Sequence, residues 1–321
     1  MKAIVYNEYG TADVLKLKEV NIPAIKDNEV LVKVHAVSVN SWDWDLLRGK
    51  PFLARLGGLN KPKFKILGAD IAGKVEAIGS GVKQFMPGDA VFGDISWCGW
   101  GGFAEYVSVR EDALTLKPDV MTFEEAAAIP QAAVLALQGI RDKGQIKEGQ
   151  KVLINGAGGG VGTFALQIAK LYGAEVTCVD RASKLDMLQS LGADHVLDYT
   201  REDFIQKGQC YDLILDVVGS RSIFNYKRIL NPKGTYVMVG GPLSLILQLV
   251  IFGPLISKVA SKNMNILFHR PNQNDQNVLK ELFLIGSVKP VIDRQFSLSE
   301  VGKAIQYLGE GHAKGKVVIV L

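Results

Sequence analysis

The sequence predicts an α/β protein of two domains, one rich in β-strands and one built on a doubly wound parallel sheet. Its 321 residues, 48% of them hydrophobic, are enough for more than one core. Short β-type runs fill residues 1–123, and helix-length and strand-length apolar segments alternate over residues 124–270. Residues 271–321 return to the first pattern, so we expect domains at 1–123 with 271–321 and at 124–270.

Each domain is predicted from its own pattern. In the first, runs such as EVLVKVHAVSVN and GKVEAIG are separated by Gly, Pro and Asp turn signals. In the second, helices are expected at 162–172 and 183–191, where apolar residues recur three or four apart. The strands expected there are KVLING, EVTCVD, HVLD, DLILDVV, GTYVMVG and NMNILF. The final residues are predicted to form a helix, an extended run, a second helix and the strand KVVIVL.

The strongest chemical signal is a glycine-rich turn between a strand and a helix, in KVLINGAGGGVGTFALQIAK. Gly156 permits a tight turn, Gly159 permits the backbone to approach a pyrophosphate, and Gly162 permits close packing of helix on strand. The amides that open the helix then hold the anionic bridge of a dinucleotide. The residues that we expect to line this bridge are Gly156, Gly158, Gly159, Gly160, Val161 and Gly162.

The end of the next strand carries conflicting signals about the nicotinamide cofactor. Asp180 has the spacing at which a carboxylate binds a free ribose 2'-hydroxyl. Arg181, Ser183 and Lys184 follow it and are suited to a 2'-phosphate. Alternatively, these charged side chains have no ligand and are simply solvated at the start of a helix. Because three residues suited to a 2'-phosphate follow Asp180, NADPH is expected as the cofactor, with NADH as the alternative.

Charge and cysteine content restrict the other classes of function. The 37 basic and 33 acidic residues include no long run of one sign, so nucleic-acid binding is not expected. Three separated cysteines and four scattered histidines indicate a reducing compartment and no metal site. No apolar signal segment opens the sequence, and we expect a cytoplasmic protein.

The segment from Pro242 to Ala260 is strongly apolar and carries Lys258 as its only charge. Gln248 and Pro254 interrupt it, and a membrane span needs about 20 predominantly apolar residues. We therefore expect a buried or dimer-facing helix, with membrane contact through residues 243–256 as the alternative.

Several stretches resemble the zinc-independent quinone oxidoreductases of the medium-chain dehydrogenase/reductase superfamily, the zeta-crystallin-like family. The most specific is GQKVLINGAGGGVGTFALQIAK, and others are VLVKVHAVSVNSWD, GADIAGKVEAIGSGV, PGDAVFG and GHAKGKVVIVL. The resemblance implies a GroES-like β domain made from both ends of the chain and a Rossmann domain between them. Zinc-dependent relatives carry Cys where this chain has Ser41, and Gly-His-Glu where it has Gly68, Ala69 and Asp70.

The resemblance also implies roles for single residues. It places the catalytic candidates Asn40 and Asp43 beside the nicotinamide and the substrate, although Asp43 is equally well explained as a turn cap. It places Tyr199 near the adenosine 2'-phosphate with Lys184, and it implies a homodimer. The remaining cofactor-binding candidates are Val218, Gly240, Gly241 and Lys316.

These patterns lead to one functional hypothesis and two alternatives. The hypothesis is hydride transfer from NADPH to a quinone or a related electron-poor carbonyl, without zinc. Trp42, Trp44 and Phe52 are candidates for a wall on which a flat substrate stacks, or for ordinary core residues. The alternatives are an alkenal/enone reductase and a nucleotide-binding structural or regulatory protein without turnover.

Overall fold

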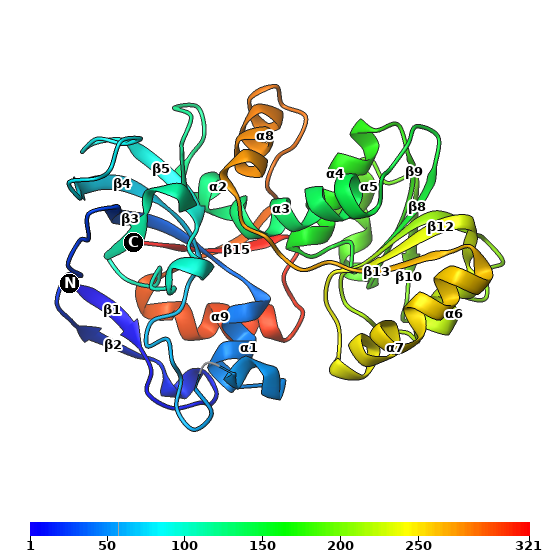
Figure 1. Cartoon of the computed structure of the whole chain (residues 1–321), viewed down its shortest axis with the longest axis horizontal. Helices are drawn as coiled ribbons and strands as arrows, with labels where there is room; N and C mark the ends of the chain where they lie inside the picture. Colours follow the sequence, from blue (N-terminus) through cyan, green and yellow to red (C-terminus); the bar gives the residue numbers. More distant parts are fainter. Residues whose placement is uncertain (57) are drawn as a thin grey trace. The chain divides into compact units, whose positions relative to one another are not determined.

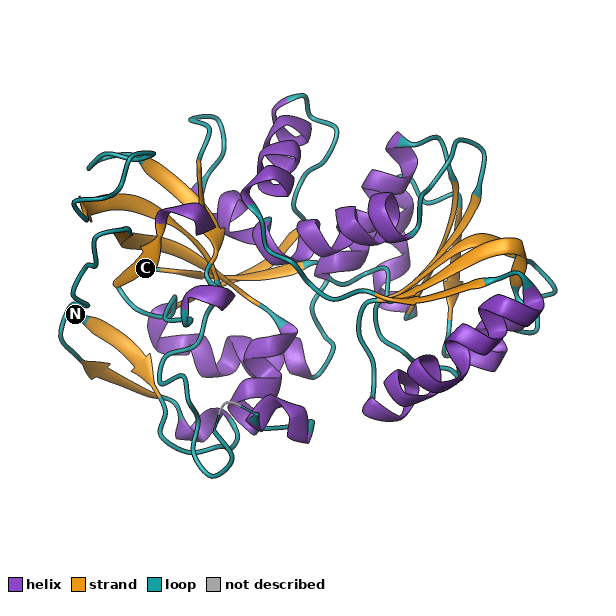
Figure 2. Cartoon of the chain, in the orientation of Figure 1, coloured by secondary structure: helices purple, strands orange, loops and turns teal. Residues whose placement is uncertain are grey.

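The computed structural model describes residues 1–56 and 58–321 and divides the chain into two compact units (Figure 1). Unit 1 consists of Met1–Gln131 with Pro271–Leu321, and unit 2 consists of Ala132–Arg270. Each unit has its own sheet and helices (Figure 2).

Unit 1 is built on a mainly antiparallel sheet in the order β14-β15-β3-β4-β5-β7, with β6 also paired to β3. A separate hairpin joins β1 to β2. Strand β15 lies between β14 and β3, so the C-terminal segment contributes two adjacent strands at one side of this sheet. The strands are β1 (Lys2–Val5), β2 (Lys16–Glu19), β3 (Glu29–Val39), β4 (Asp70–Ile78), β5 (Ala90–Asp94), β6 (Tyr106–Arg110), β7 (Leu114–Leu116), β14 (Ile292–Ser297) and β15 (Lys316–Val320). The helices are α1 (Ser41–Arg48), α2 (Phe123–Ala128), α3 (Pro130–Leu137), which runs into unit 2, α8 (Gln273–Leu284) and α9 (Val301–Gly309).

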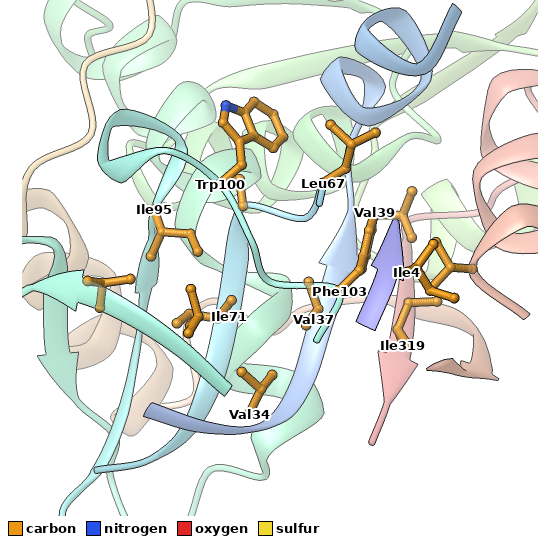
Figure 3. Packing of buried hydrophobic residues seen from close by; sticks show 14 of the residues in the cluster. Ile4, Val34, Val37, Val39, Leu67, Ile71, Ile95, Trp100, Phe103 and Ile319 are labelled. Carbon is orange, nitrogen blue, oxygen red and sulfur yellow. The ribbon is translucent and has the colours of Figure 1, made fainter. Parts of the chain in front are cut away.

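The core of unit 1 forms where β-branched residues of several strands meet. Val34, Val37 and Val39 of β3 are at most 4% exposed. Figure 3 shows them with Ile71 of β4 and Ile319 of β15 in one cluster. Burial of such side chains contributes about 1.5–3 kcal/mol each. This core holds the end of β3, and therefore the start of α1, in place.

Unit 2 has a six-stranded parallel sheet in the order β10-β9-β8-β11-β12-β13. The chain order reverses between β8 and β11, which is the position where doubly wound sheets bind ligands beyond the carboxyl ends of their strands. Helices α4 and α5 lie on one face of the sheet, and α6 and α7 lie on the other (Figure 1). The strands are β8 (Lys151–Asn155), β9 (Glu175–Asp180), β10 (His195–Asp198), β11 (Tyr211–Asp216), β12 (Leu230–Met238) and β13 (Asn263–Ile266). The helices are α4 (Gly160–Leu171), α5 (Leu185–Ser190), α6 (Ile223–Arg228) and α7 (Leu243–Ala260).

The first division between the units differs from the predicted one. The sequence pattern places it at residues 123/124, and the structure places it at Gln131/Ala132. Helix α2 packs on β3 and β4 and so belongs to unit 1. Its sequence, FEEAAA, begins the helical pattern of the second half, although its three alanines are buried against the first sheet. The second division lies at Arg270/Pro271.

Helix α7 is buried on one face and exposed on the other, so a buried helix is found for one face, and a dimer contact of the other face stays a prediction. Leu245, Leu249 and Ile256 join the core of unit 2, whereas Val250 and Ile251 are 61% and 62% exposed. By length and composition the helix could also cross a membrane, with 18 residues and a mean hydropathy of 1.9.

Candidate active site

The glycine turn lies between β8 and α4, and each of its three spaced glycines meets a different requirement. Gly156 has a φ of +81°, which glycine adopts without strain. A Cβ on Gly162 would lie 2.5 Å from the backbone of Ala157, so helix and strand approach too closely for a side chain. A Cβ on Gly159 would meet only the Gly156 carbonyl oxygen, at 3.7 Å, so the space beyond Gly159 is open.

The start of α4 supplies backbone donors beside this open space. Gly159 is its N-cap, and Gly160 and Val161 occupy the first turn. The first four amides of an α-helix have no partner within the helix, and the helix dipole makes this end positive. Backbone donors and free space together fit the pyrophosphate of a dinucleotide.

Asp180 ends β9 and is turned toward the glycine turn. Its carboxylate accepts hydrogen bonds from the backbone amides of Gly158 (2.7 Å) and Arg181 (2.9 Å). The Nζ atom of Lys184 lies 3.7 Å from the same carboxylate, and both side chains are 8% exposed. A Cβ on Gly158 would lie 2.5 Å from Lys184, so glycine is required here to bring the turn and the ion pair together. Asp180 therefore fixes the glycine turn.

A second polar group lies at the surface beside Asp180. The Arg181 guanidinium donates to the Tyr199 hydroxyl at 3.3 Å, and Tyr199 is 43% exposed. Ser183 is exposed on the short turn between Arg181 and α5. Arginine and phenolic hydroxyl are donors suited to a phosphate monoester. The structure thus brings together Arg181, Tyr199 and Lys184, which the sequence proposes for the 2'-phosphate.

The loops after β11 and β12 border the same edge of the sheet. Val218 lies against Gly156, where a Cβ would meet its Cγ1 at 2.6 Å. A Cβ on Gly240 would lie 2.8 Å from the Val217 carbonyl oxygen, and one on Gly219 would lie 2.6 Å from Gly241. Val218, Gly240 and Gly241 therefore lie together, as a cofactor-lining role requires.

A buried polar network that no sequence pattern indicated lies beneath this edge. Asp216, which is 0% exposed, accepts hydrogen bonds from Asn155 Nδ2 (2.8 Å), the Tyr236 hydroxyl (2.8 Å) and the Gly219 amide (2.9 Å). Burial raises the pKa of Asp216, and these hydrogen bonds oppose the rise. The network ties the end of β8 to the loop after β11. An Asp at the end of a strand of buried apolar residues was the available signal.

In unit 1 the structure gathers a second polar cluster at the ends of β3, β4 and β15. Asn40 Nδ2 donates to Asp70 Oδ2 at 2.9 Å, and Lys316 Nζ donates to Asn40 Oδ1 at 2.6 Å. Lys316 Nζ also lies 3.6 Å from Asp70 Oδ2, and Ser38 donates to that same oxygen. Burial lowers the pKa of Lys316, whereas Asp70 and Asp43 raise it. We call Ser38, Asn40, Asp43, Asp70 and Lys316 the polar cluster.

Asp43 has the contacts of a capping residue. Its carboxylate accepts hydrogen bonds from the amides of Asn40 (2.8 Å) and Gly68 (2.9 Å), and it is fully buried. Burial raises the pKa of Asp43 to about 7, although these two amides oppose the rise. Asp43 therefore fixes the backbone that carries Asn40.

Lys316 and Asp70 change the expected composition of the two sites. Lys316 is expected among the cofactor-binding residues, and the structure places it in the polar cluster with Asn40. Asp70 is noted in the sequence only as a replacement in a zinc-ligand position, whereas it is the acceptor on which the cluster converges. The missed signal was a carboxylate and a lysine in strands that otherwise consist of buried apolar residues.

An aromatic pocket of about 160 Å³ adjoins α1 in unit 1. Of the three aromatic residues proposed for a substrate wall, Trp42 lines it, at 48% exposed. Trp44 instead packs against Gly309 and beneath the Arg48 guanidinium, and Phe52 is 64% exposed outside the lining. The residues that line the pocket are Tyr6, Tyr9, Trp42, Leu46, Ala54, Gly58, Pro62, Lys63 and Phe64.

Comparison with known proteins gives the family. Residues 26–119 match the alcohol dehydrogenase GroES-like domain, and residues 191–319 match a family described as zinc-binding dehydrogenase. A chloroplast envelope quinone oxidoreductase homolog of Arabidopsis thaliana is 34% identical over 99% of this chain and 98% of its own length. This chain belongs to the quinone oxidoreductase family of the medium-chain dehydrogenase/reductase superfamily.

Two further similarities bear on the whole chain. An NADPH-dependent alkenal/one oxidoreductase of Arabidopsis thaliana is 33% identical over 99% of this chain and 79% of its own. The solved structure of a quinone oxidoreductase from Coxiella burnetii has a TM-score of 0.89 and 31% identity, and covers 100% of this chain and 99% of that one. This member of the quinone oxidoreductase family therefore has the two-domain fold, GroES-like and Rossmann, that the resemblance implies.

The name of one matched family raises the question of zinc. Ser41 and Ala69 offer no thiolate or imidazole, and the Asp70 carboxylate is engaged by Asn40, Ser38 and Lys316. Among residues 1–56 and 58–321, no three His, Cys, Asp or Glu side chains are placed to share an ion. The donor set of the polar cluster does not fit zinc.

Proposed function

We propose that this protein is an NADPH-dependent, zinc-independent oxidoreductase that reduces a quinone or a related electron-poor carbonyl compound. The observation that carries the proposal is the group formed in unit 2 by the glycine turn, the start of α4 and the end of β9, which we call the dinucleotide seat. Open space at Gly159, the amides of the first turn of α4, and a cation beside a phenol at the end of β9 occur together there. The relatives named for quinones and for alkenals or enones support the acceptor class.

NADPH is favoured over NADH by how Asp180 is used. A carboxylate that selects a free ribose has to be turned toward the ribose hydroxyls. Asp180 instead accepts from the Gly158 and Arg181 amides and pairs with Lys184. Arg181 and Tyr199 lie beside it at the surface and would hold the 2'-phosphate.

Reduction of the acceptor requires hydride transfer, orientation and a proton. NADPH, when bound, supplies the hydride. The amide of Asn40 is held at both ends by Asp70 and Lys316, so its direction is fixed and it can orient an acceptor oxygen. Burial lowers the pKa of Lys316, so its ammonium group, which donates to Asn40, can release a proton to the reduced acceptor more readily than a solvated lysine can. Because the cluster provides no Lewis acid, the acceptor has to be electron-poor.

The cofactor assignment is tested by titrating both reduced nicotinamides into wild type and an Arg181→Ala variant. We expect wild type to bind NADPH at least tenfold more tightly than NADH, and Arg181→Ala to lose most of that difference. Lys147→Ala, which removes an exposed cation elsewhere in unit 2, is the control and should bind as wild type does. Equal binding of both nucleotides by wild type would refute the NADPH assignment.

The acceptor is tested by following NADPH oxidation with a naphthoquinone and with a short enone. Faster turnover of the naphthoquinone supports the proposal, and faster turnover of the enone supports the alkenal/enone reductase. That second function is favoured by the alkenal/one relative at 33% identity. Tight NADPH binding without oxidation across the panel would instead support a nucleotide-binding protein that has no turnover.

We also propose a cytoplasmic homodimer. Sedimentation velocity measures the oligomeric state, and fractionation of the source cells measures the location. A monomer at micromolar concentration would refute the first part, and recovery in a sealed organelle would refute the second.

A further inference from the structure

The outward face of α7 is apolar along its length. We define the outer stripe as the exposed large apolar residues of this face. They recur three or four residues apart on the side opposite Leu245, Leu249 and Ile256, which are buried. Soluble monomers rarely expose a continuous apolar surface of this extent. The outer stripe consists of Leu243 (40% exposed), Leu247 (50%), Val250 (61%), Ile251 (62%), Leu255 (59%) and Val259 (74%).

The apolar surface continues onto α6, beside α7 (Figure 1). Phe224 of α6 is 45% exposed, and Phe252 of α7 is 39% exposed. Their rings pack against each other with centroids 5.4 Å apart. The exposed face therefore combines aliphatic residues with two aromatic rings, the composition typical of helices that lie at a bilayer interface.

The segment of chain that contains this surface carries charged residues of one sign only. Residues 217–274 contain no Asp or Glu and seven Lys or Arg, so the segment carries +7. The whole chain has 37 basic and 33 acidic residues, which leaves 30 and 33, or −3, for the rest. The basic excess of the protein therefore lies entirely in the segment that contains α6 and α7.

Hydrogen bonds place several of these cations at the carboxyl end of α7. Lys258 is in the last turn, and the Lys233 amide donates to the Ser261 carbonyl at 2.8 Å, just beyond the helix. Lys262 Nζ donates to the Lys227 carbonyl at 2.8 Å, which brings the end of α6 to the same place. We call Lys227, Lys233, Lys258 and Lys262 the basic cluster. An apolar stripe with cations at one end fits acyl chains beneath anionic headgroups.

We propose that α7 docks flat on an anionic phospholipid bilayer, with the outer stripe in the acyl boundary and the basic cluster among the phosphates. The helix does not cross the bilayer, because Leu245, Leu249 and Ile256 are packed into the core of unit 2. A second copy is a poorer occupant. An interface with two-fold symmetry would bury the outer stripe against itself and would supply no anionic partner for the basic cluster.

The test is cosedimentation of the full chain with phospholipid vesicles. We expect binding to vesicles of phosphatidylcholine with about 30 mol% phosphatidylserine, and at least tenfold weaker binding to phosphatidylcholine alone. Raising NaCl from about 0.1 M to about 0.5 M should also weaken binding, since salt screens the basic cluster. Equal binding to both vesicles, or none to either, would overturn the proposal.

Two sets of variants locate the binding surface. Leu247→Gln with Ile251→Gln should reduce binding about tenfold or more, because both side chains are exposed apolar contacts of the outer stripe. The control is Val120→Gln with Ile285→Gln, a pair in unit 1 that is 74% and 72% exposed and should bind as wild type does. Lys258→Glu should weaken binding to phosphatidylserine vesicles, and Lys147→Glu is its control.

Unchanged binding of the outer-stripe variant would overturn the proposal. A second result would also overturn it: no binding to vesicles, together with self-association in sedimentation velocity that depends on Leu247 and Ile251. That result would identify a second copy as the occupant of the outer stripe. NADPH affinity and melting temperature, measured for every variant, verify that unit 2 remains folded. Lipid binding does not depend on hydride transfer, so the two proposals fail separately.

Discussion

Two glycines three positions apart, Gly159 and Gly162, illustrate how single residues serve different purposes in the dinucleotide seat. Gly159 faces open space and has extended backbone, so an added methyl group costs the fold little. Gly162 is closed against the backbone of Ala157 at 2.5 Å, so an added methyl group has to displace main chain. One position serves the ligand, and the other serves the packing of α4 on β8.

The first prediction follows from this contrast. Gly159→Ala should weaken NADPH binding at least tenfold and leave the melting temperature within about 1–2 °C, whereas Gly162→Ala should lower stability by about 1–3 kcal/mol. Calorimetric titration and thermal unfolding of both variants measure the two effects. A Gly159→Ala protein that binds NADPH normally would remove the pyrophosphate from this position.

The second prediction concerns pH and Asp43. In the unfolded chain an Asp ionises near pH 4, and in the folded protein Asp43 has a pKa of about 7. Between these values the folded state holds more protons, so the stabilising contribution of Asp43 is complete below about pH 4 and is lost as the pH rises toward 7. Urea unfolding at about pH 5 and pH 8 should therefore show a larger loss of stability for wild type than for Asp43→Asn. Parallel losses in the two proteins would contradict the buried, protonated state.

The third prediction concerns the aromatic pocket. Trp42→Ala should raise the KM for a naphthoquinone several-fold with little change in stability, because Trp42 lines the pocket while half exposed. Trp97→Ala is the matched control, since Trp97 is 66% exposed and outside the lining. If both variants raise the KM equally, the pocket is not the acceptor site.

Among the elements, α7 separates burial from exposure along a single helix. Leu249→Ala should lower stability by about 2–5 kcal/mol, because Leu249 is 4% exposed in the core of unit 2. Leu247→Ala, two residues earlier and 50% exposed, should change it by about 0.5 kcal/mol or less. Chemical denaturation of the two variants gives both values, and similar losses would mean that the outer stripe is buried in solution.

The elements of unit 2 could be predicted closely from the sequence, because each strand of a parallel sheet is a short run of buried apolar residues between turn signals. The observed β9 and β10 have the bounds expected from EVTCVD and HVLD. Helix α6 was not predicted. The exposed face of α7 could not be predicted either, because a helix that is apolar all round carries no mark of which side is covered.

The two sites differ in how many of their residues could be predicted from the sequence. The glycine turn is local, so spacing alone identified its residues, and the structure brings them together. The polar cluster joins residues from distant parts of the chain, with Lys316 bound to Asn40 across 276 positions. No local pattern reports such a contact, and the cofactor-binding role predicted for Lys316 came from the family resemblance alone. The roles of these residues in binding and catalysis remain predictions.

For the whole molecule, ligand binding should appear as stability. NADPH at about 100 times its Kd should stabilise the folded state by about 2.7 kcal/mol, because it binds the folded seat and not the unfolded chain. Differential scanning calorimetry with and without NADPH measures the shift, and Gly159→Ala is expected to show a much smaller one. If NADPH does not change the unfolding temperature of the wild-type protein, the proposed dinucleotide seat of unit 2 is contradicted.

The position of β15 has a consequence for synthesis on the ribosome. Its partner β3 is translated long before it, with Val317 pairing with Val39, and all of unit 2 lies between them in the chain. Residues 132–270 form a continuous unit that can fold as it emerges from the ribosome. During that time the edge of β3 that pairs with β15 has no partner strand. An unpaired edge of buried valines invites intermolecular pairing. Nascent chains stalled near residue 300 should therefore recruit chaperones to unit 1, and release of the last strand should end that dependence.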